Sequence, residues 1–192
     1  MNKLRTLILM LLCLTSLPVM AGEESTELGF WFEAGAASGK NPSWLTGYYD
    51  HSFTDSLGFY VLAEKESDGY REFYAGPKWK PLEWLEVGVG AGREITREMP
   101  NSARRNAYVA IDTDKVSVYA TYENGGSGPW HKAYALYKVS ETVNAGVMYE
   151  TLYGTGARAE YTIKKNVAVW GALLRNRDTR ETTTLVAATY SF

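Results

Sequence analysis

Apolar and polar residues alternate with a period of two along most of the chain. The alternation occurs in twelve segments of about ten residues each, at positions 28–37, 44–54, 57–65, 70–80, 84–94, 104–112, 115–123, 130–139, 142–152, 157–164, 167–177 and 182–192. Successive side chains of a β-strand point to opposite sides, so this pattern indicates strands with one apolar and one polar face. Clusters of Gly, Asn, Asp, Ser and Pro between the segments are typical of turns. The pattern predicts an all-β protein of antiparallel strands.

The last segment contains no Pro, no Gly and no charged residue. Phe192, Tyr190, Ala188 and Val186 share one face, and the other face is smaller and mostly polar. At the border of an open sheet, such a strand would present an unprotected edge. We therefore expect it to have a partner on both sides, and pairing with segment 28–37 would close the sheet into a barrel.

The first 21 residues have the pattern of a cleaved signal peptide. Lys3 and Arg5 precede an apolar run over 7–17, and Ala21 ends a stretch that resembles a cleavage site. The apolar run is too short to span a bilayer, and no later stretch is long and apolar enough for a transmembrane helix. The predicted organisation is a signal peptide over 1–21 and one domain over 22–192, which contains no cysteine and hence no disulfide.

Export, alternation and the aromatic C-terminus together resemble bacterial outer-membrane β-barrels, which typically end in Phe with aromatic or apolar residues at alternating positions before it. The resemblance implies a transmembrane antiparallel up-and-down β-barrel of about 12 strands, with 10 or 8 as alternatives. It assigns Tyr190 and Phe192 to the assembly signal. Small size and short connections are similar to the monomeric oligogalacturonate-specific porins, in architecture only. A soluble periplasmic sandwich is the rival fold.

Charged residues are predicted to face the interior, because a charge facing lipid is costly. Residues 22–123 carry 17 acidic and 10 basic residues, whereas residues 124–192 carry 5 and 8. Sequence order is position around a barrel wall, so an acidic wall should face a basic one. Segment 167–177 is apolar on both faces, and there Arg175 assigns Val169, Gly171 and Leu173 to the interior. The predicted pore-lining residues are Glu33, Asp50, Glu64, Glu72, Glu86, Glu123, Lys132, Lys138, Glu150, Arg158, Glu160 and Arg175.

A wet lumen with opposed charged walls predicts a narrow porin-like channel for small polar or charged solutes. The alternative is a plugged structural or envelope-interaction barrel, in which charges pair and inward tyrosines fill the interior. These tyrosines are Tyr48, Tyr60, Tyr74, Tyr108, Tyr119 and Tyr134. Gly88, Gly90 and Gly92 would leave a low wall on one strand, over which neighbouring bulky side chains could lean.

No catalytic motif is found, and we do not expect an enzyme. The weakest alternative is a lipid-modifying enzyme that uses Ser127, His131 and Glu123 at the outer rim. No residues have the spacing of metal ligands, and no cofactor is predicted. Beyond the signal peptide the chain carries 22 acidic and 18 basic residues, which argues against nucleic acid as a partner.

Four arginines, Arg93, Arg97, Arg104 and Arg105, cluster around the longest outer connection. They predict contacts with the phosphates of lipopolysaccharide, and a solvated basic loop is the alternative. The expected partners are outer-membrane lipids including lipopolysaccharide, the barrel-assembly machinery during insertion, and small polar solutes. We expect the barrel to be a monomer.

Overall fold

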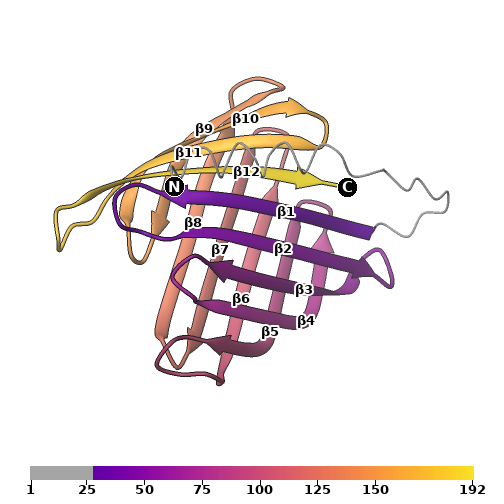
Figure 1. Cartoon of the computed structure of the whole chain (residues 1–192). Helices are drawn as coiled ribbons and strands as arrows, with labels where there is room; N and C mark the ends of the chain where they lie inside the picture. The colour runs from indigo at the N-terminus through magenta and orange to yellow at the C-terminus, as the bar shows by residue number, and fades with distance from the viewer. Residues whose placement is uncertain (1–27) are drawn as a thin grey trace.

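The computed structural model describes residues 28–192, which form one closed barrel of twelve antiparallel strands (Figure 1). The strands are β1 (Leu28–Ala37), β2 (Ser43–Ser52), β3 (Leu57–Glu66), β4 (Arg71–Leu82), β5 (Leu85–Ile95), β6 (Ser102–Asp112), β7 (Val116–Gly125), β8 (Gly128–Lys138), β9 (Val143–Glu150), β10 (Gly154–Lys164), β11 (Val167–Arg175) and β12 (Thr182–Ser191). The predicted barrel and its twelve strands are confirmed, and the alternatives of ten and eight are wrong. The predicted signal peptide, residues 1–21, lies outside the described residues.

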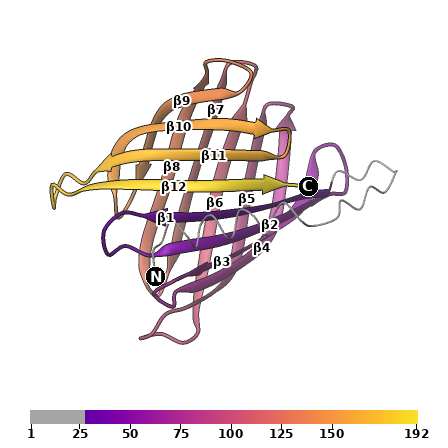
Figure 2. The same cartoon turned by 45° about the horizontal axis from the view of Figure 1, so that its top comes forward.

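Each strand pairs with its neighbours in sequence, and β1 pairs with β12 to close the barrel. In Figure 1, β1–β3 and β11–β12 run across the view in front of the steeply running β6–β8, and Figure 2 shows the same crossing from above. Opposite walls cross in this way because the strands of a barrel are strongly tilted. Within the described residues, no helix is long and apolar enough to cross a membrane.

The two ends of the barrel differ in their connections. One end, which we call the loop end, carries the connections 38–42, 67–70, 96–101, 126–127, 151–153 and 176–181. The other, the turn end, carries 53–56, 83–84, 113–115, 139–142 and 165–166, together with the C-terminus. Most connections fall where the turn residues of the sequence predicted them, but Gly154 and Gly156, expected between two strands, belong to β10.

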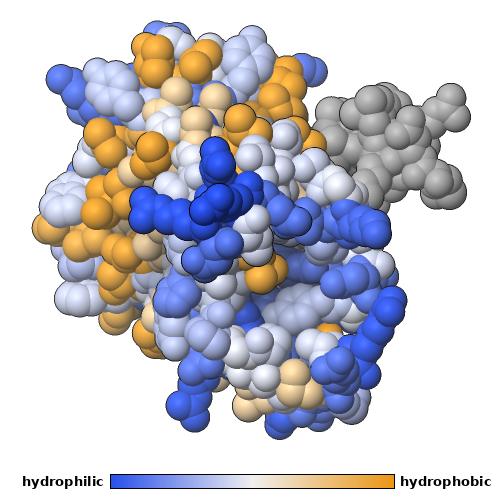
Figure 3. All heavy atoms as spheres, turned by 90° about the vertical axis from the view of Figure 1, so that its left-hand side faces the viewer, coloured by the Kyte–Doolittle hydropathy of each residue, from blue (hydrophilic) through white to orange (hydrophobic). Residues whose placement is uncertain are grey.

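The outside of the wall is apolar. Phe73, Val89 and Val147 point away from the interior and are each half or more exposed. In Figure 3, hydrophobic residues gather beside a hollow that is surrounded by hydrophilic residues. Alternation along the strands thus separates an apolar exterior from a polar interior, which is the arrangement that a barrel in a lipid bilayer needs.

The predicted inward face of segment 167–177 is wrong. Trp170, Ala172 and Leu174 are buried inside the barrel, whereas Leu173 is 56% exposed on the outside. Arg175, which decided the prediction, is exposed at the loop end of β11 on the outward face. A charge at a strand end lies beyond the apolar belt, so it does not determine which face of an otherwise apolar strand points inward.

The C-terminal residue takes part in closing the barrel. Phe192 N donates a hydrogen bond of 2.9 Å to Phe30 O on β1. The Phe192 ring lies 5.3 Å from the ring of Phe30, 6.2 Å from that of Phe32 and 4.7 Å from that of Tyr190. These contacts join the first and last strands on the outer face of the wall.

We expect Phe192→Ala to weaken this closure, because it removes three aromatic contacts that are each worth about 0.5–1.5 kcal/mol. The folded fraction recovered from the membrane should fall, while the molecules that do fold should keep an unchanged interior. The matched control is Phe53→Ala, which removes an exposed aromatic ring from the β2–β3 turn, away from the β1–β12 seam. Equal folding yields for the two variants would show that Phe192 has no special role in assembly.

Candidate functional site

Two hollows inside the barrel make up the candidate site. The larger has a volume of about 550 Å³ and reaches Asp50, Glu86 and Ser191 near the turn end. The smaller has a volume of about 260 Å³ and reaches Asp68 and Tyr153 at the loop end. Together they extend along the interior from one end of the barrel to the other.

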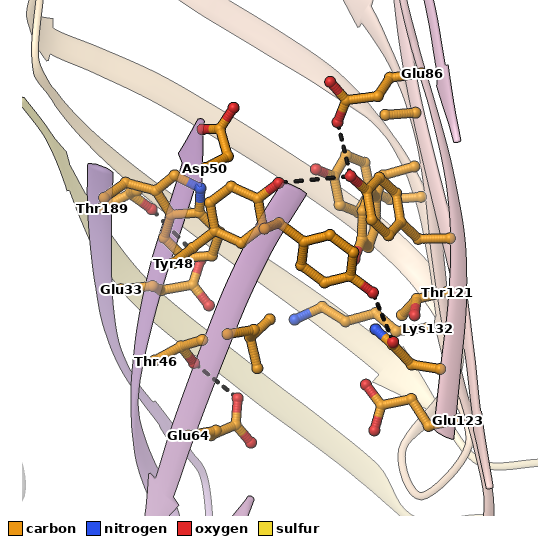
Figure 4. Close-up of a pocket in the computed structure, with 18 of the residues that line it drawn as sticks. Glu33, Thr46, Tyr48, Asp50, Glu64, Glu86, Thr121, Glu123, Lys132 and Thr189 are labelled. Carbon is orange, nitrogen blue, oxygen red and sulfur yellow. Dashed lines mark hydrogen bonds between the residues drawn. The ribbon is translucent and has the colours of Figure 1, made fainter. Parts of the chain in front are cut away.

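The two hollows meet at a shared set of side chains. Five residues line both of them: Glu64, Glu72, Glu123, Trp130 and Lys132. Figure 4 shows Lys132 reaching into the larger cavity between the walls that carry Glu64 and Glu123. Within the described residues, Lys132 makes no ion pair of 4 Å or less. We call this junction the constriction. It places the carboxylates of Glu64, Glu72 and Glu123 and the ammonium group of Lys132 along the same stretch of the interior, without an ion pair between them and Lys132.

An ion cluster centred on Arg104 lies beside the constriction. The guanidinium group is 3.0 Å from Glu72, 2.8 Å from Glu94 and 3.0 Å from Glu123. Arg104 is 3% exposed and Glu94 is fully buried. A charge at this depth is stable only with partners that satisfy its hydrogen bonds, and Arg104 has a carboxylate on each side.

Further hydrogen bonds extend the Arg104 cluster to the loop end. The Tyr74 hydroxyl lies 2.8 Å from a carboxylate oxygen of Glu72 and 2.8 Å from one of Glu123, so it bridges the two acids. Glu94 accepts hydrogen bonds from the backbone N–H and the hydroxyl of Ser127, at 2.7 and 2.6 Å. The cluster therefore fastens the β7–β8 connection to the inner wall.

Two tyrosines in the loop-end connections belong to the wall of the smaller hollow. Burial raises the pKa of Tyr70, and the neighbouring Glu72 carboxylate raises it further. Burial also raises the pKa of Tyr153, with a further contribution from Glu150. Both hydroxyls therefore remain neutral donors around pH 7, and Tyr70 donates to Glu72.

A second ion cluster lies toward the turn end. Lys78 pairs with Asp50 and lies 3.4 Å from Glu86, and Glu86 also accepts a hydrogen bond of 2.8 Å from Tyr108. Lys78 is an inward cation among the acidic strands, where the sequence predicted mainly carboxylates. Its two carboxylate partners are thus neutralised in part within the wall.

Aromatic side chains hold Arg158 on β10 and Glu33 on β1 in place. The Arg158 guanidinium lies 4.1 Å from the Tyr134 ring and 4.2 Å from the Trp170 ring, and it donates to Glu160 at 3.2 Å. Glu33 accepts hydrogen bonds from the indole N–H groups of Trp44 and Trp170, at 3.0 and 2.7 Å. Stacking and fixed donors keep both charged groups in defined positions in the lumen.

Glycines on β5 allow tyrosines to cross one side of the interior, as the sequence predicted. A Cβ on Gly88 would come within 2.2 Å of the Tyr108 ring, and one on Gly90 within 2.5 Å of the Tyr60 hydroxyl. Tyr60 thereby reaches over β4 and β5 and donates to Asn106 on β6 at 2.6 Å. The tyrosines fill this side of the lumen without closing it, because the larger hollow lies beside them.

An apolar cluster fills another side of the interior. It is formed by side chains of β1, β9, β11 and β12 together with Tyr153, and its buried members are Ala37, Met148, Tyr153, Trp170, Ala172, Leu174, Leu185 and Ala187. The open path is thus confined to the space between the apolar cluster and the tyrosines.

The structure places most of the predicted pore-lining residues around the two hollows. Ten of the twelve line one or both: Glu33, Asp50, Glu64, Glu72, Glu86, Glu123, Lys132, Glu150, Arg158 and Glu160. Lys138 lies at the turn end, where it pairs with Asp112 at 2.9 Å. Arg175 lies outside the lumen, beside Arg177 and Arg180 around a separate surface hollow. Its assignment to the interior is therefore corrected.

Arg104 and Glu94 are the important residues absent from the predicted site. The sequence groups Arg104 with Arg93, Arg97 and Arg105 as residues for lipopolysaccharide phosphates or a solvated loop, but it is buried inside the barrel whereas the other three are exposed. The alternation that points Tyr108 and Asn106 inward extends to Arg104, so the signal was present in the sequence. It was missed because Arg104 stands next to a loop.

The suggested Ser127, His131 and Glu123 set is not assembled. Ser127 and Glu123 both contact Arg104 inside the barrel, whereas His131 packs against Tyr122 on the outward face, with ring centroids 4.8 Å apart. In the part of the chain that the structure describes, no group of three or more His, Cys, Asp or Glu residues could hold a metal ion.

The barrel is similar to solved porin structures, although no protein-family model matches the chain and no curated protein matches its sequence. The KdgM porin, in a complex with disordered oligogalacturonate, is 15% identical with a TM-score of 0.57, over 85% of this chain and 99% of that one. The NanC porin is 9% identical with a TM-score of 0.51, over 85% and 100%. A structure from a study of the in-meso crystallization of membrane proteins is 12% identical with a TM-score of 0.64, over 85% of this chain and 83% of that one. The chain thus has the barrel fold of the small porins.

We expect Arg104→Met to destabilise the barrel strongly, because it leaves Glu72, Glu94 and Glu123 buried without their cation. Removal of one member of a buried ion cluster typically lowers the free energy of unfolding by about 3–5 kcal/mol. Urea unfolding of the protein in lipid vesicles, followed by tryptophan fluorescence, measures the change. Arg105→Met is the matched control, since this neighbouring arginine is exposed on the outside and should change stability little. Similar losses in both variants would contradict the role assigned to the cluster.

Proposed function

We propose that the protein is a narrow porin-like channel of the outer membrane for small polar or charged solutes. The observation that carries the proposal is the pair of polar hollows that meet at the constriction and together reach both ends of the barrel. A barrel that served only as a scaffold would gain stability by packing this space, because buried charges are stabilised less well than apolar side chains of similar volume. The apolar exterior supports the proposed location in a membrane.

Solutes with a positive group are favoured by the charge of the path. Three basic residues line the two hollows, Arg104, Lys132 and Arg158, and Arg104 is already enclosed by carboxylates. Ten acidic residues line them: Glu33, Asp50, Glu64, Glu66, Asp68, Glu72, Glu86, Glu123, Glu150 and Glu160. Rings of carboxylates select for cations in narrow pores. We therefore infer passage of small cations and zwitterions in preference to anions.

The charge of the lumen separates this chain from the porin whose complex contains oligogalacturonate. Each galacturonate unit bears a carboxylate, so the oligomer is a polyanion. The excess of carboxylates along the present path would repel such a ligand. The shared barrel fold does not carry that ligand over to this protein.

Further partners follow from a location in the outer membrane. We propose that the barrel-assembly machinery inserts the chain through its C-terminal strand, with Tyr190 and Phe192 in the recognised segment. The finished barrel would act as a monomer surrounded by outer-membrane lipids, including lipopolysaccharide. The closed ring of twelve strands supports a monomer, since it leaves no strand edge for a second copy.

The channel proposal predicts that the purified, folded barrel gives small, discrete current steps in a planar lipid bilayer. The steps are expected because the two polar hollows meet at shared side chains, and they should be small because tyrosines and an apolar cluster occupy part of the interior. The control is a preparation of the same protein denatured before addition, which should produce no steps. A barrel that is demonstrably folded yet silent would exclude the channel and favour the plugged alternative.

A second prediction concerns selectivity at the constriction. The wild-type barrel should pass K⁺ in preference to Cl⁻, as measured by the reversal potential in a salt gradient. Within residues 28–192, the Glu64 carboxylate has one hydrogen-bond donor, the Thr46 hydroxyl at 2.7 Å, and no cation within 4 Å. Glu64→Gln should therefore lower the permeability ratio about two- to fourfold. Glu181→Gln, an exposed change in the β11–β12 connection, is the control and should leave the ratio unchanged.

A further inference from the structure

Four cations stand side by side on the outward face of neighbouring strands at the loop end. They are Lys65 on β3, Arg71 on β4, Arg93 on β5 and Arg105 on β6, and we call them the basic row. Lys65 is directly opposite Arg71 in the strand register. Arg93 pairs with Phe73 and Arg105 with Ala91, so each is one diagonal step from the preceding member. Directly opposite side chains have Cβ atoms about 5 Å apart, and diagonal ones about 7–8 Å.

No carboxylate among the described residues is in ion-pair contact with the basic row. All four residues are exposed, and none of them forms an ion pair with any residue in the range 28–192. Like charges directly opposite each other on a sheet are destabilising, as Lys65 and Arg71 are here. Together with the diagonal neighbours Arg93 and Arg105 they form a surface that an external anion would stabilise.

The position of the basic row matches the border of the apolar belt. Below it toward the turn end, the outward positions of the same strands are occupied by apolar residues such as Val61, Phe73, Val89 and Val109. Among the other eight strands, Arg175 on β11 is the one Lys or Arg in an equivalent outward position. The cations therefore gather on one sector of the wall, at the level where lipid headgroups begin.

We propose that the basic row binds the phosphate groups of lipopolysaccharide in the outer leaflet. This inference rests on the proposed outer-membrane location. Arginine is suited to phosphate because its planar group donates two parallel hydrogen bonds. The acyl chains of the same lipid would lie along the apolar residues below the row.

A fifth cation in the adjacent loop extends the site. Arg97 leans toward the β3–β4 connection, where its Nε lies 3.8 Å from the position that a Cβ on Gly69 would take. It is exposed, like the members of the row. Arg97 is therefore placed to contact a second phosphate or the sugar next to it. Arg104, although adjacent in sequence, takes no part because it is inside the barrel.

Native mass spectrometry of the full mature protein in detergent tests the proposal. The titrants are lipid A carrying two phosphates, the same lipid after removal of both phosphates, and inorganic phosphate. We expect saturable binding of the phosphorylated lipid and much weaker binding of the other two. The double variant Arg71→Gln/Arg93→Gln should bind phosphorylated lipid A about tenfold or more weakly, because two charge-assisted contacts are lost. Arg93→Lys keeps the charge and should lose less.

The control for charge is Lys115→Gln/Lys165→Gln, which removes two exposed lysines from turn-end connections and should leave binding unchanged. Equal binding by the row variant and this control would overturn the proposal, as would equal binding of lipid A with and without phosphates. Binding of inorganic phosphate as tight as that of lipid A would show an anion site without a lipid partner, and would also overturn it. The row variant should conduct like the wild type in a phosphatidylcholine bilayer. Native mass spectrometry measures lipid binding independently of conductance. A folded barrel that binds lipid A but conducts no current would therefore refute the channel proposal and leave the lipid-binding proposal standing.

Discussion

A charge inside a closed barrel must find its partners within the wall, and the interior of this protein is organised by that requirement. Removal of a carboxylate or a guanidinium group from water costs several kcal/mol unless other groups replace the lost hydrogen bonds. Arg104 meets the requirement with Glu72, Glu94 and Glu123, each from a different strand. The cluster thereby connects β4, β5, β6 and β7 from the inside, in addition to the backbone ladder that connects neighbouring strands. Arg158 meets it differently, with two aromatic faces and one carboxylate.

Two further features of the interior determine where space remains beside the paired charges. Glycines at 88 and 90 remove side chains from the middle of β5, so tyrosines from β3 and β6 fill that side. On another side, apolar side chains pack around Trp170 and Leu185. The free space between them is a path lined mainly by polar and charged side chains. The plugged and open alternatives are thus not exclusive, since the tyrosines narrow the lumen beside a hollow of about 550 Å³.

The fold followed from the sequence because its main signal is local. A period of two, repeated in twelve segments, identifies each strand and its two faces without knowledge of any distant contact. The signal failed for β11, where both faces are apolar and the one charge lies at the strand end. At β6 the same alternation extends to Arg104, which continues the inward face of Asn106 and Tyr108. Alternation predicted ten residues around the hollows, because an inward charge on a barrel strand almost necessarily faces the lumen.

The positions of these charges along the barrel axis could not be predicted, because they depend on the stagger between strands and on side-chain rotamers, and the residue pattern specifies neither. The stagger determines which charges form ion pairs with one another, and hence the net charge of the path. The distribution of charge along the chain predicted an acidic wall facing a basic one. However, the cations Lys78 and Arg104 lie among the acidic strands and form ion pairs with carboxylates there. On the other wall, Arg158 pairs with Glu160, while Lys132 and Glu150 have no ion-pair partner within residues 28–192. Each wall therefore neutralises part of its own charge, and the lining groups outside these ion pairs, Glu33, Glu64 and Glu150 against Lys132, are mainly acidic. The net charge of the lining residues is therefore negative along the path, which agrees with the preference for cations proposed above.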